Sequence, residues 1–191
     1  MTVKMPTNPP STEQTARLTG EELLALGDVG PVELIKGELV DVTPAGHPHS
    51  YYEGNVYVAL RKFVREHKLG RVLVGEVGIY TRRNPDTVRG ADVAYISNER
   101  LDQVESQSYL DVAPELIVEI LSPHERWVEV MEKLDEYFAI DVLMVWVVDP
   151  QRQQIYVYHS PTDVERFTAK EAISGGEVLS GLKIVVAELF E

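Results

Sequence analysis

Two carboxylates in the sequence stand where an ionised side chain is costly. Glu119 interrupts the apolar run "PELIVEILSP" (residues 114–123), whose β-branched content predicts a strand buried on both faces. Asp92 lies at the start of "ADVAYIS" (residues 91–97), where strand alternation puts it on an apolar face. A buried carboxylate must be paired or bound to a metal. Two such acids on neighbouring strands could hold Mg²⁺ or Mn²⁺, with the backbone carbonyl of Ile120 as a further ligand.

Lys133 is the third residue with a chemical interpretation. Apolar residues recur at helical spacing over about residues 125–140, and Lys133 lies on the border of that apolar stripe. A long side chain at such a border can reach inward. Together with the two acids it would suit metal-dependent hydrolysis of a phosphate ester. The metal would activate a water and polarise the phosphoryl group, while the lysine orients the water or stabilises developing charge.

Each of these residues also has a purely structural interpretation. Asp92 could cap a strand end or a turn, and Glu119 could form a buried ion pair with an arginine or lysine. For Lys133, spacing alone favours a surface lysine paired with acids of its own helix. Those acids are Glu129, Glu132 and Glu136.

The surrounding pattern mixes helices and strands and predicts an α/β or α+β fold with a central sheet. A capping box of Thr19 and Glu22 opens a short helix. The predicted helices cover residues 19–26, 49–68 and 125–140. The predicted strands lie in residues 32–42 (two strands joined at Lys36–Gly37), 71–81 (one or two strands), 91–97, 114–123, 142–148, 155–160 and 181–190 (one strand and a terminal turn). Residues 1–16 are rich in Pro, Thr and Ser, which predicts a flexible tail. We expect residues 17–191 to form a single domain.

Composition bounds the class of protein. The 191 residues are 44% hydrophobic and 26% charged, which is typical of a globular domain with a real core. No apolar run is long enough to span a bilayer, and the N-terminus lacks the order of a signal peptide. The absence of cysteine excludes disulfides and thiol chemistry and fits a cytoplasmic protein. The net charge of −13 argues against general attraction to nucleic acid or anionic membrane.

One segment departs from this acidic average. Basic residues dominate between positions 61 and 89, and a solvated helix face with an Arg-rich turn is favoured over a phosphate-binding strip. The basic residues are Arg61, Lys62, Arg65, Lys68, Arg71, Arg82, Arg83 and Arg89.

The order of acid, acid within an apolar strand, and lysine resembles the PD-(D/E)XK nuclease superfamily. More closely, the chain resembles the Uma-two family from Leu18 onward. The matching segments are "VELIKGELVDVTP" (residues 32–44), "GHPHS" (46–50), "RGADVAYIS" (89–97), "PELIVEILSP" (114–123) and "EKLDEYFAIDVLMVWVVDP" (132–150).

The chain departs from the superfamily pattern in two places. Ala91 replaces the proline of the Pro-Asp pair, and the literal Pro85–Asp86 sits in an Arg-flanked turn with no apolar strand after it. We therefore assign the motif acid to Asp92. The usual lysine position, two residues after the glutamate, is Leu121, and Lys133 on the next helix matches the migrated lysine of the family.

The resemblance implies a restriction-endonuclease-like fold and a Mg²⁺- or Mn²⁺-dependent endonuclease that hydrolyses DNA, often as a homodimer. Asp92 and Glu119 would hold the metal, and Lys133 would act on the water. Three further candidates lie in family-like segments. Glu33 could be an additional acid near the metal, His49 is expected to cap or orient its helix, and Tyr137 could hydrogen-bond at the site or belong to the core.

A second function from another class stays open. The chain could keep the nuclease fold but act as a DNA-associated or protein-interaction module with little or no hydrolysis, which the acidic composition favours. A glycosidase that uses two carboxylates is a distant third, since aromatic residues are only 8% of the chain.

Overall fold

A mixed β-sheet organises the molecule. The structure, a computed structural model, describes residues 17–123 and 125–191, so the tail expected over residues 1–16 lies outside the described residues. The main sheet has eight strands in the order β2-β1-β4-β5-β6-β7-β8, with β3 paired to β4. Strands β9 and β10 form a separate hairpin. The strands are β1 (Val32–Ile35), β2 (Glu38–Asp41), β3 (Gly70–Arg82), β4 (Thr87–Ser97), β5 (Leu116–Ile120), β6 (Met144–Asp149), β7 (Gln154–Ser160), β8 (Asp163–Thr168), β9 (Ala172–Gly175) and β10 (Leu179–Val185).

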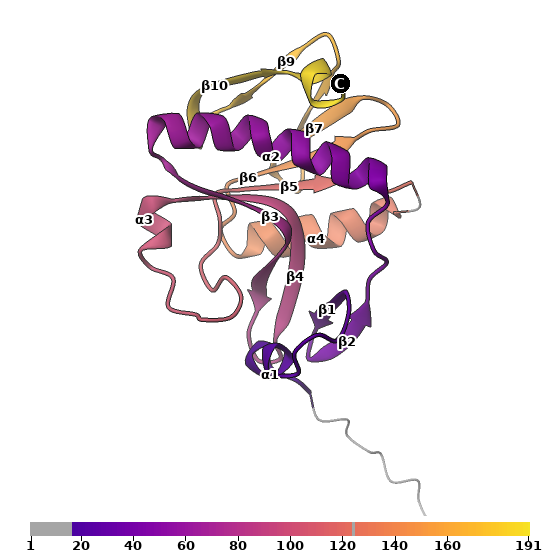
Figure 1. The fold of residues 1–191 in the computed structure, drawn as a ribbon, viewed down its shortest axis with the longest axis vertical. Helices are drawn as coiled ribbons and strands as arrows, with labels where there is room; N and C mark the ends of the chain where they lie inside the picture. The colour runs from indigo at the N-terminus through magenta and orange to yellow at the C-terminus, as the bar shows by residue number, and fades with distance from the viewer. Residues whose placement is uncertain (1–16, 124) are drawn as a thin grey trace, which may run out of the picture.

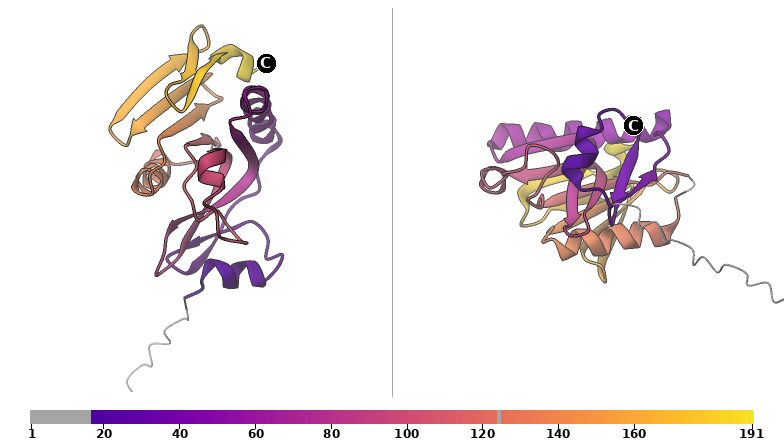
Figure 2. Two further views of the ribbon diagram at one scale, coloured as in Figure 1. Left: turned by 90° about the vertical axis from the view of Figure 1, so that its left-hand side faces the viewer. Right: turned by 90° about the horizontal axis from the view of Figure 1, so that it is seen from below.

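Two long helices lie on opposite faces of this sheet (Figures 1 and 2). Helix α2 and the β9–β10 hairpin cover one face, and helix α4 covers the other. The helices are α1 (Gly20–Ala25), α2 (His47–His67), α3 (Asn98–Leu101) and α4 (Trp127–Ala139), followed by the 3₁₀ helix η1 (Val186–Leu189). None of the helices in the described residues is long and apolar enough to cross a membrane.

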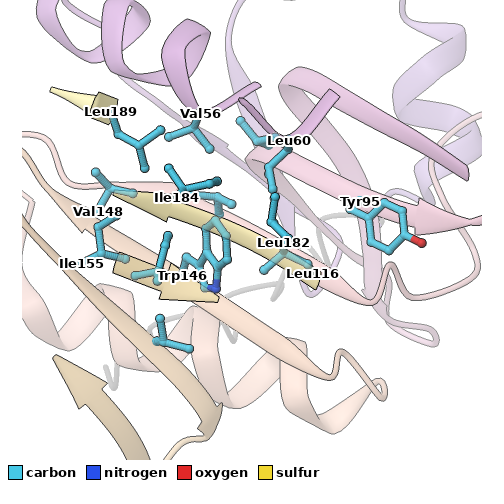
Figure 3. Packing of buried hydrophobic residues seen from close by; sticks show 14 of the residues in the cluster. Val56, Leu60, Tyr95, Leu116, Trp146, Val148, Ile155, Leu182, Ile184 and Leu189 are labelled. Carbon is cyan, nitrogen blue, oxygen red and sulfur yellow. The ribbon is translucent and has the colours of Figure 1, made fainter. Parts of the chain in front are cut away.

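The larger core lies between the sheet and α2. Trp146 of β6 is fully buried there, against side chains from α2 and from the C-terminal hairpin such as Leu60 and Ile184 (Figure 3). The smaller core packs α4 on the other face through its apolar stripe, which includes Val130, Leu134 and Tyr137. Strands β5 and β6 are parallel and every residue of both is buried, which explains their nearly uninterrupted apolar sequences.

The structure differs from the sequence prediction at the ends of some elements. Helix α2 begins at His47, two residues before the predicted start, because Pro48 suits the first turn of a helix. Strands β8 and β9 were not predicted: β8 is an exposed edge strand and β9 has only four residues, so neither has a clear apolar pattern. The single domain expected over residues 17–191 stays a prediction.

Candidate active site

The candidate site lies where β4 and β5 part. The antiparallel ladder between these strands ends at the Val93–Val118 pair. One residue further, the Oδ2 atom of Asp92 accepts the backbone N–H of Ile120 at 2.6 Å. The carboxylate thus takes the place of a ladder carbonyl. Asp92 lies in the middle of β4, and its side chain caps the backbone N–H of the last residue of β5. The point where the two strands part, here called the fork, brings Asp92 next to the end of β5, which carries Glu119.

Lys133 and Tyr137 reach Glu119 from α4. The Lys133 Nζ atom lies 2.9 Å from Glu119 Oε2, and the Tyr137 hydroxyl donates to Oε1 at 2.6 Å. The two donors are four residues apart and therefore share one face of the helix. The surface position that spacing favoured for Lys133 is wrong, because its amine pairs with Glu119 and not with the acids of its own helix. Tyr137 fulfils both of its expectations: it belongs to the core and it hydrogen-bonds at the site.

Burial and like charge raise the pKa of Glu119 to about 7. Burial is the largest cause, and the negative charge of Asp92 adds to it, while Lys133 and the Tyr137 hydrogen bond oppose the shift. Burial of Lys133 disfavours its charge, yet the carboxylates of Glu119 and Glu33 outweigh that effect and raise the pKa of the amine. The site therefore carries more negative charge than its lysine balances.

His49 approaches Asp92 from the first turn of α2. Its Nε2 atom lies 3.2 Å from Asp92 Oδ2, and this hydrogen bond raises the pKa of the imidazole. His49 does not cap its helix, because Gly46 is the N-cap residue and no side chain caps this end. The alternative expectation, that His49 orients the helix, stays a prediction. The Nδ1 atom of His49 is buried and has no hydrogen-bond partner within the described residues.

Two acids that the sequence analysis missed lie beside Asp92. A bulge in β3 falls between Val74 and Val77, opposite the segment of β4 that contains Asp92. Glu53 of α2 accepts the backbone N–H of Gly75 in this bulge at 2.9 Å. Burial, followed by the charge of Asp92, raises the pKa of both Glu53 and Glu76. Glycine inside a strand pattern often marks a bulge, so Gly75 was the sequence signal for Glu76.

Glu33 is held by an arginine and does not contact Asp92. Its Oε2 atom accepts from Arg89 at 2.9 Å, and its Oε1 atom accepts the backbone N–H of Gly90 at 3.0 Å. Arg89 also donates two hydrogen bonds to Glu136 of α4, at 2.7 and 2.8 Å. The carbonyl of Gly90 accepts from Lys133 Nζ at 3.4 Å. Glu33 therefore reaches the site through the Gly90 peptide.

The basic segment is not one continuous strip. Arg89 is buried, so it cannot meet a ligand at the surface. Arg83 pairs with Glu21 and Asp86, and the Asp86 carboxylate accepts the N–H of Gly20 at 2.9 Å, away from the fork. Within this segment, the exposed cations for which the structure records no ion pair in the described part of the chain lie mainly on the second half of α2 and the start of β3. They are Arg61, Lys62, Arg65, Lys68 and Arg71, with Arg82 at the end of β3.

The donor set at the fork is small. Within residues 17–123 and 125–191, no group of three or more acidic or histidine side chains is arranged to hold a metal ion. Asp92 and Glu119 come from the two strands that part here, and the backbone of Ile120, the residue after Glu119, donates to Asp92. Two carboxylates and one carbonyl would leave several positions of a hard cation to water, as is usual for Mg²⁺.

Comparison with known proteins identifies the family of the chain. The family model described as "Uma2: Putative restriction endonuclease" matches residues 21–187, which is most of the chain. The chain belongs to this family. No curated protein matches the sequence.

A solved structure shares the fold. The crystal structure of a protein described as a putative nuclease belonging to DUF820, from Anabaena variabilis, aligns with a TM-score of 0.75. The alignment covers 91% of this chain and 97% of that chain, at 21% sequence identity. The predicted mixed α/β fold of a nuclease is therefore confirmed.

Proposed function

We propose that this member of the Uma2 family is a divalent-metal-dependent endonuclease that hydrolyses DNA phosphodiester bonds. The observation that carries the proposal is the meeting of Asp92, Glu119 and Lys133 at one fork. They come from β4, β5 and α4, and the Glu119–Lys133 pair is 2.9 Å apart inside the protein. A lysine that turns inward to a strand acid next to a second acid is the arrangement that this chemistry requires.

The residues present fit Mg²⁺ or Mn²⁺. Asp92, Glu119 and the Ile120 carbonyl would hold the ion, because hard cations prefer oxygen ligands. Burial first, and then the negative charge of Asp92, raise the pKa of Glu53, Glu76 and Glu119. A bound divalent cation would neutralise that charge. Both oxygens of Glu119 already accept a hydrogen bond, but each retains a second lone pair for a ligand bond.

A bound ion would polarise a phosphoryl oxygen and lower the pKa of a coordinated water. Lys133 would orient the attacking water or stabilise charge that develops on the phosphate. Tyr137 would keep the Glu119 carboxylate in place through its hydrogen bond of 2.6 Å. The exposed cations of α2 and β3 would contact the DNA backbone, which positions a substrate without reading its sequence.

Cleavage assays on plasmid and single-stranded DNA with Mg²⁺ or Mn²⁺ test the proposal. We expect Glu119→Gln and Lys133→Met each to lower the rate by about 10²–10³-fold, since each removes a charge that acts on the transition state. Glu132→Gln and Lys183→Met are matched controls, because both side chains are exposed and neither has a recorded hydrogen bond or ion pair in the described residues. Cleavage that persists in Lys133→Met would assign the activity to another mechanism or to a contaminating nuclease.

A DNA-associated module without hydrolysis is the second candidate. The observation that favours it is that Lys133 and Tyr137 already satisfy both oxygens of Glu119, so the site is closed as an ion pair. The same assay separates the two functions: DNA binding with no metal-dependent cleavage would support the module. The expected homodimer stays a prediction, which sedimentation velocity would contradict by detecting only the monomer mass.

A further inference from the structure

A cavity of about 230 Å³ adjoins the candidate site. It lies where α1 and the β1–β2 hairpin pack beside the β3–β4 hairpin (Figure 1). Val32 and Val88 form apolar wall, the Tyr109 ring lies at one side, and Glu76 contributes a carboxylate. Drug-sized ligands usually occupy about 300–1,000 Å³, so this cavity suits a smaller group such as one ring system.

Two paired glycines leave room for the groups that line the cavity. Gly78 of β3 stands opposite Gly90 of β4 in the ladder. A Cβ atom at Gly78 would lie 2.2 Å from the Tyr109 ring, and a Cβ atom at Gly90 would lie 2.5 Å from Glu76 Oε2. Bare backbone at both positions therefore lets an aromatic ring and a carboxylate lie close against the sheet.

The cavity and the candidate site share one peptide. Gly90 lines the cavity, while its carbonyl accepts from Lys133 Nζ at 3.4 Å and Asp92 follows two residues later. A group bound in the cavity would therefore be a neighbour of a phosphate held at the fork. A nucleotide carries its base and its phosphate on one sugar, so one nucleotide would contact both places.

We propose that the cavity binds an unpaired nucleobase next to the phosphate that is cleaved. A base offers a π-face for the Tyr109 ring, and stacking on an aromatic side chain accepts any base. Much of the Glu76 residue is exposed, but its carboxylate lies against Gly90 and is partly buried. The carboxylate has no hydrogen-bond or ion-pair partner in the described part of the chain, so it can accept from N–H groups on the edge of a base. Val32 and Val88 exclude water from the ring.

This assignment names a substrate class. Bases in a duplex are stacked and their donor edges are paired, so a base must be unpaired or flipped out to enter a pocket. DNA with an unpaired base at the cleavage position, as in a single strand or an overhang, is thus the substrate that fits. The location of the phosphate rests on the proposed function, whereas binding of a base by the cavity can be measured without hydrolysis.

Fluorescence anisotropy with Ca²⁺ in place of Mg²⁺ tests the cavity. The probes are a labelled single-stranded oligonucleotide and the fully paired duplex of the same sequence. We expect the wild type to bind the single strand at least tenfold more tightly. Tyr109→Ala should weaken single-strand binding by about 5- to 150-fold, the usual loss for one stacked base, with little change for the duplex, whereas Tyr109→Phe should bind normally.

Two further variants keep the test decisive. Glu76→Gln, at an exposed position, should weaken single-strand binding even if Tyr109→Ala fails to fold. Tyr156→Ala is the matched control, since Tyr156 also packs edge-on against one aromatic neighbour but lies on β7. Equal affinity for both probes, or an equal loss for both in Tyr109→Ala, would overturn the assignment. Single-strand preference without cleavage in Mg²⁺ or Mn²⁺ would refute the nuclease alone, and cleavage without preference would refute the cavity alone.

Discussion

Glu119 is tolerated inside β5 because each of its carboxylate oxygens has its own donor. Lys133 supplies a charge to one oxygen and Tyr137 a hydroxyl to the other. A carboxylate in such a site keeps its hydrogen bonds but loses its water, which is why burial still raises its pKa to about 7. A small change in pH or in local charge is therefore enough to change its protonation state.

The raised pKa of Glu119 predicts that metal binding depends on pH. Because the proton must leave before the carboxylate binds a cation, we expect the dissociation constant for Mn²⁺ to rise about tenfold per pH unit below pH 7 and to level off above it. Isothermal titration between pH 5 and 8 measures this. Glu132→Gln should keep the slope and Glu119→Gln should lose it; the same slope in both would show that another group titrates.

Protonation of Glu119 also links pH to the stability of the metal-free protein. The native state holds this proton more tightly than the unfolded chain, in which the pKa has its ordinary value of 4.5. The free energy of unfolding should therefore fall as the pH rises from about 4.5 to 7 and then become constant. Urea titrations of wild type and Glu119→Gln measure the free energy of unfolding at each pH. Parallel curves of this free energy against pH for the two proteins would show that Glu119 is not the group that titrates.

Tyr137→Phe removes one donor and leaves the ring in the core. We expect the free energy of unfolding to fall by about 1.5–3 kcal/mol, the usual value for a hydrogen bond to a charged group, and Mn²⁺ binding to weaken because the carboxylate is free to rotate. Urea unfolding and titration with Mn²⁺ measure the two effects. Tyr158→Phe is the control, since Tyr158 packs in the same core and its hydroxyl has no recorded hydrogen bond in the described residues. If the two substitutions changed stability and Mn²⁺ binding equally, the Tyr137 hydroxyl would not be what holds the Glu119 carboxylate.

At the scale of the elements, Arg89 joins three of them. Its guanidinium binds Glu33 of β1 and Glu136 of α4 from its own position in β4. Glu136 lies three residues after Lys133, so this contact also holds the part of α4 that carries the lysine. Thr81 of β3 donates to the same Glu136 carboxylate at 3.0 Å. The register of α4 over the fork thus depends on an arginine that makes no contact with Glu119.

Arg89→Met should destabilise the protein by about 3–5 kcal/mol, because it leaves the buried Glu33 and the half-buried Glu136 without their cation. Chemical denaturation measures the loss, and adding Glu33→Gln and Glu136→Gln should recover part of it. Arg82→Met is the control, since Arg82 is exposed and has no recorded ion pair. If Arg89→Met instead lost DNA binding with unchanged stability, Arg89 would be a DNA contact of the basic segment and not a structural residue.

The whole molecule carries a net charge of −13, yet a group of exposed cations lies on the second half of α2 and the start of β3: Arg61, Lys62, Arg65, Lys68 and Arg71. The fork lies near the first turn of α2, where His49 meets Asp92, and the cations follow on the second half of the same helix. An acidic protein can therefore still offer one basic surface to a phosphate backbone.

Arg61→Gln combined with Arg65→Gln should reduce the salt dependence of DNA binding. Each lost phosphate contact lowers the slope of log K against log[salt] by about 0.7–0.9, so the pair should lower it by about 1.4–1.8 with no change in thermal stability. Arg166→Gln on the exposed edge strand β8 is the control. An unchanged slope in the double variant would mean that DNA does not lie along α2.

The sequence was sufficient for the main strands, the two long helices and the two buried acids. Apolar runs and helical spacing are local patterns, and an acid within such a run is visible without a structure. Lys133 lies on the border of the apolar stripe of its helix, so its side chain could point either to solvent or into the protein. The structure decides for the inward direction, because Glu119 is buried and needs a cation.

The remaining assignments depended on which strands are neighbours. Arg89 looked like part of a basic surface, but β1 and α4 place Glu33 and Glu136 around it, 56 and 47 residues away along the chain. Glu76 looked like an ordinary strand acid until the bulge in β3 set it opposite Asp92. Local propensity carries no information about such distant partners, whereas pairing of buried charge acts only between groups that the fold brings into contact. The sequence by itself therefore determined that a buried acidic site exists, and only the tertiary structure decided which charges complete it.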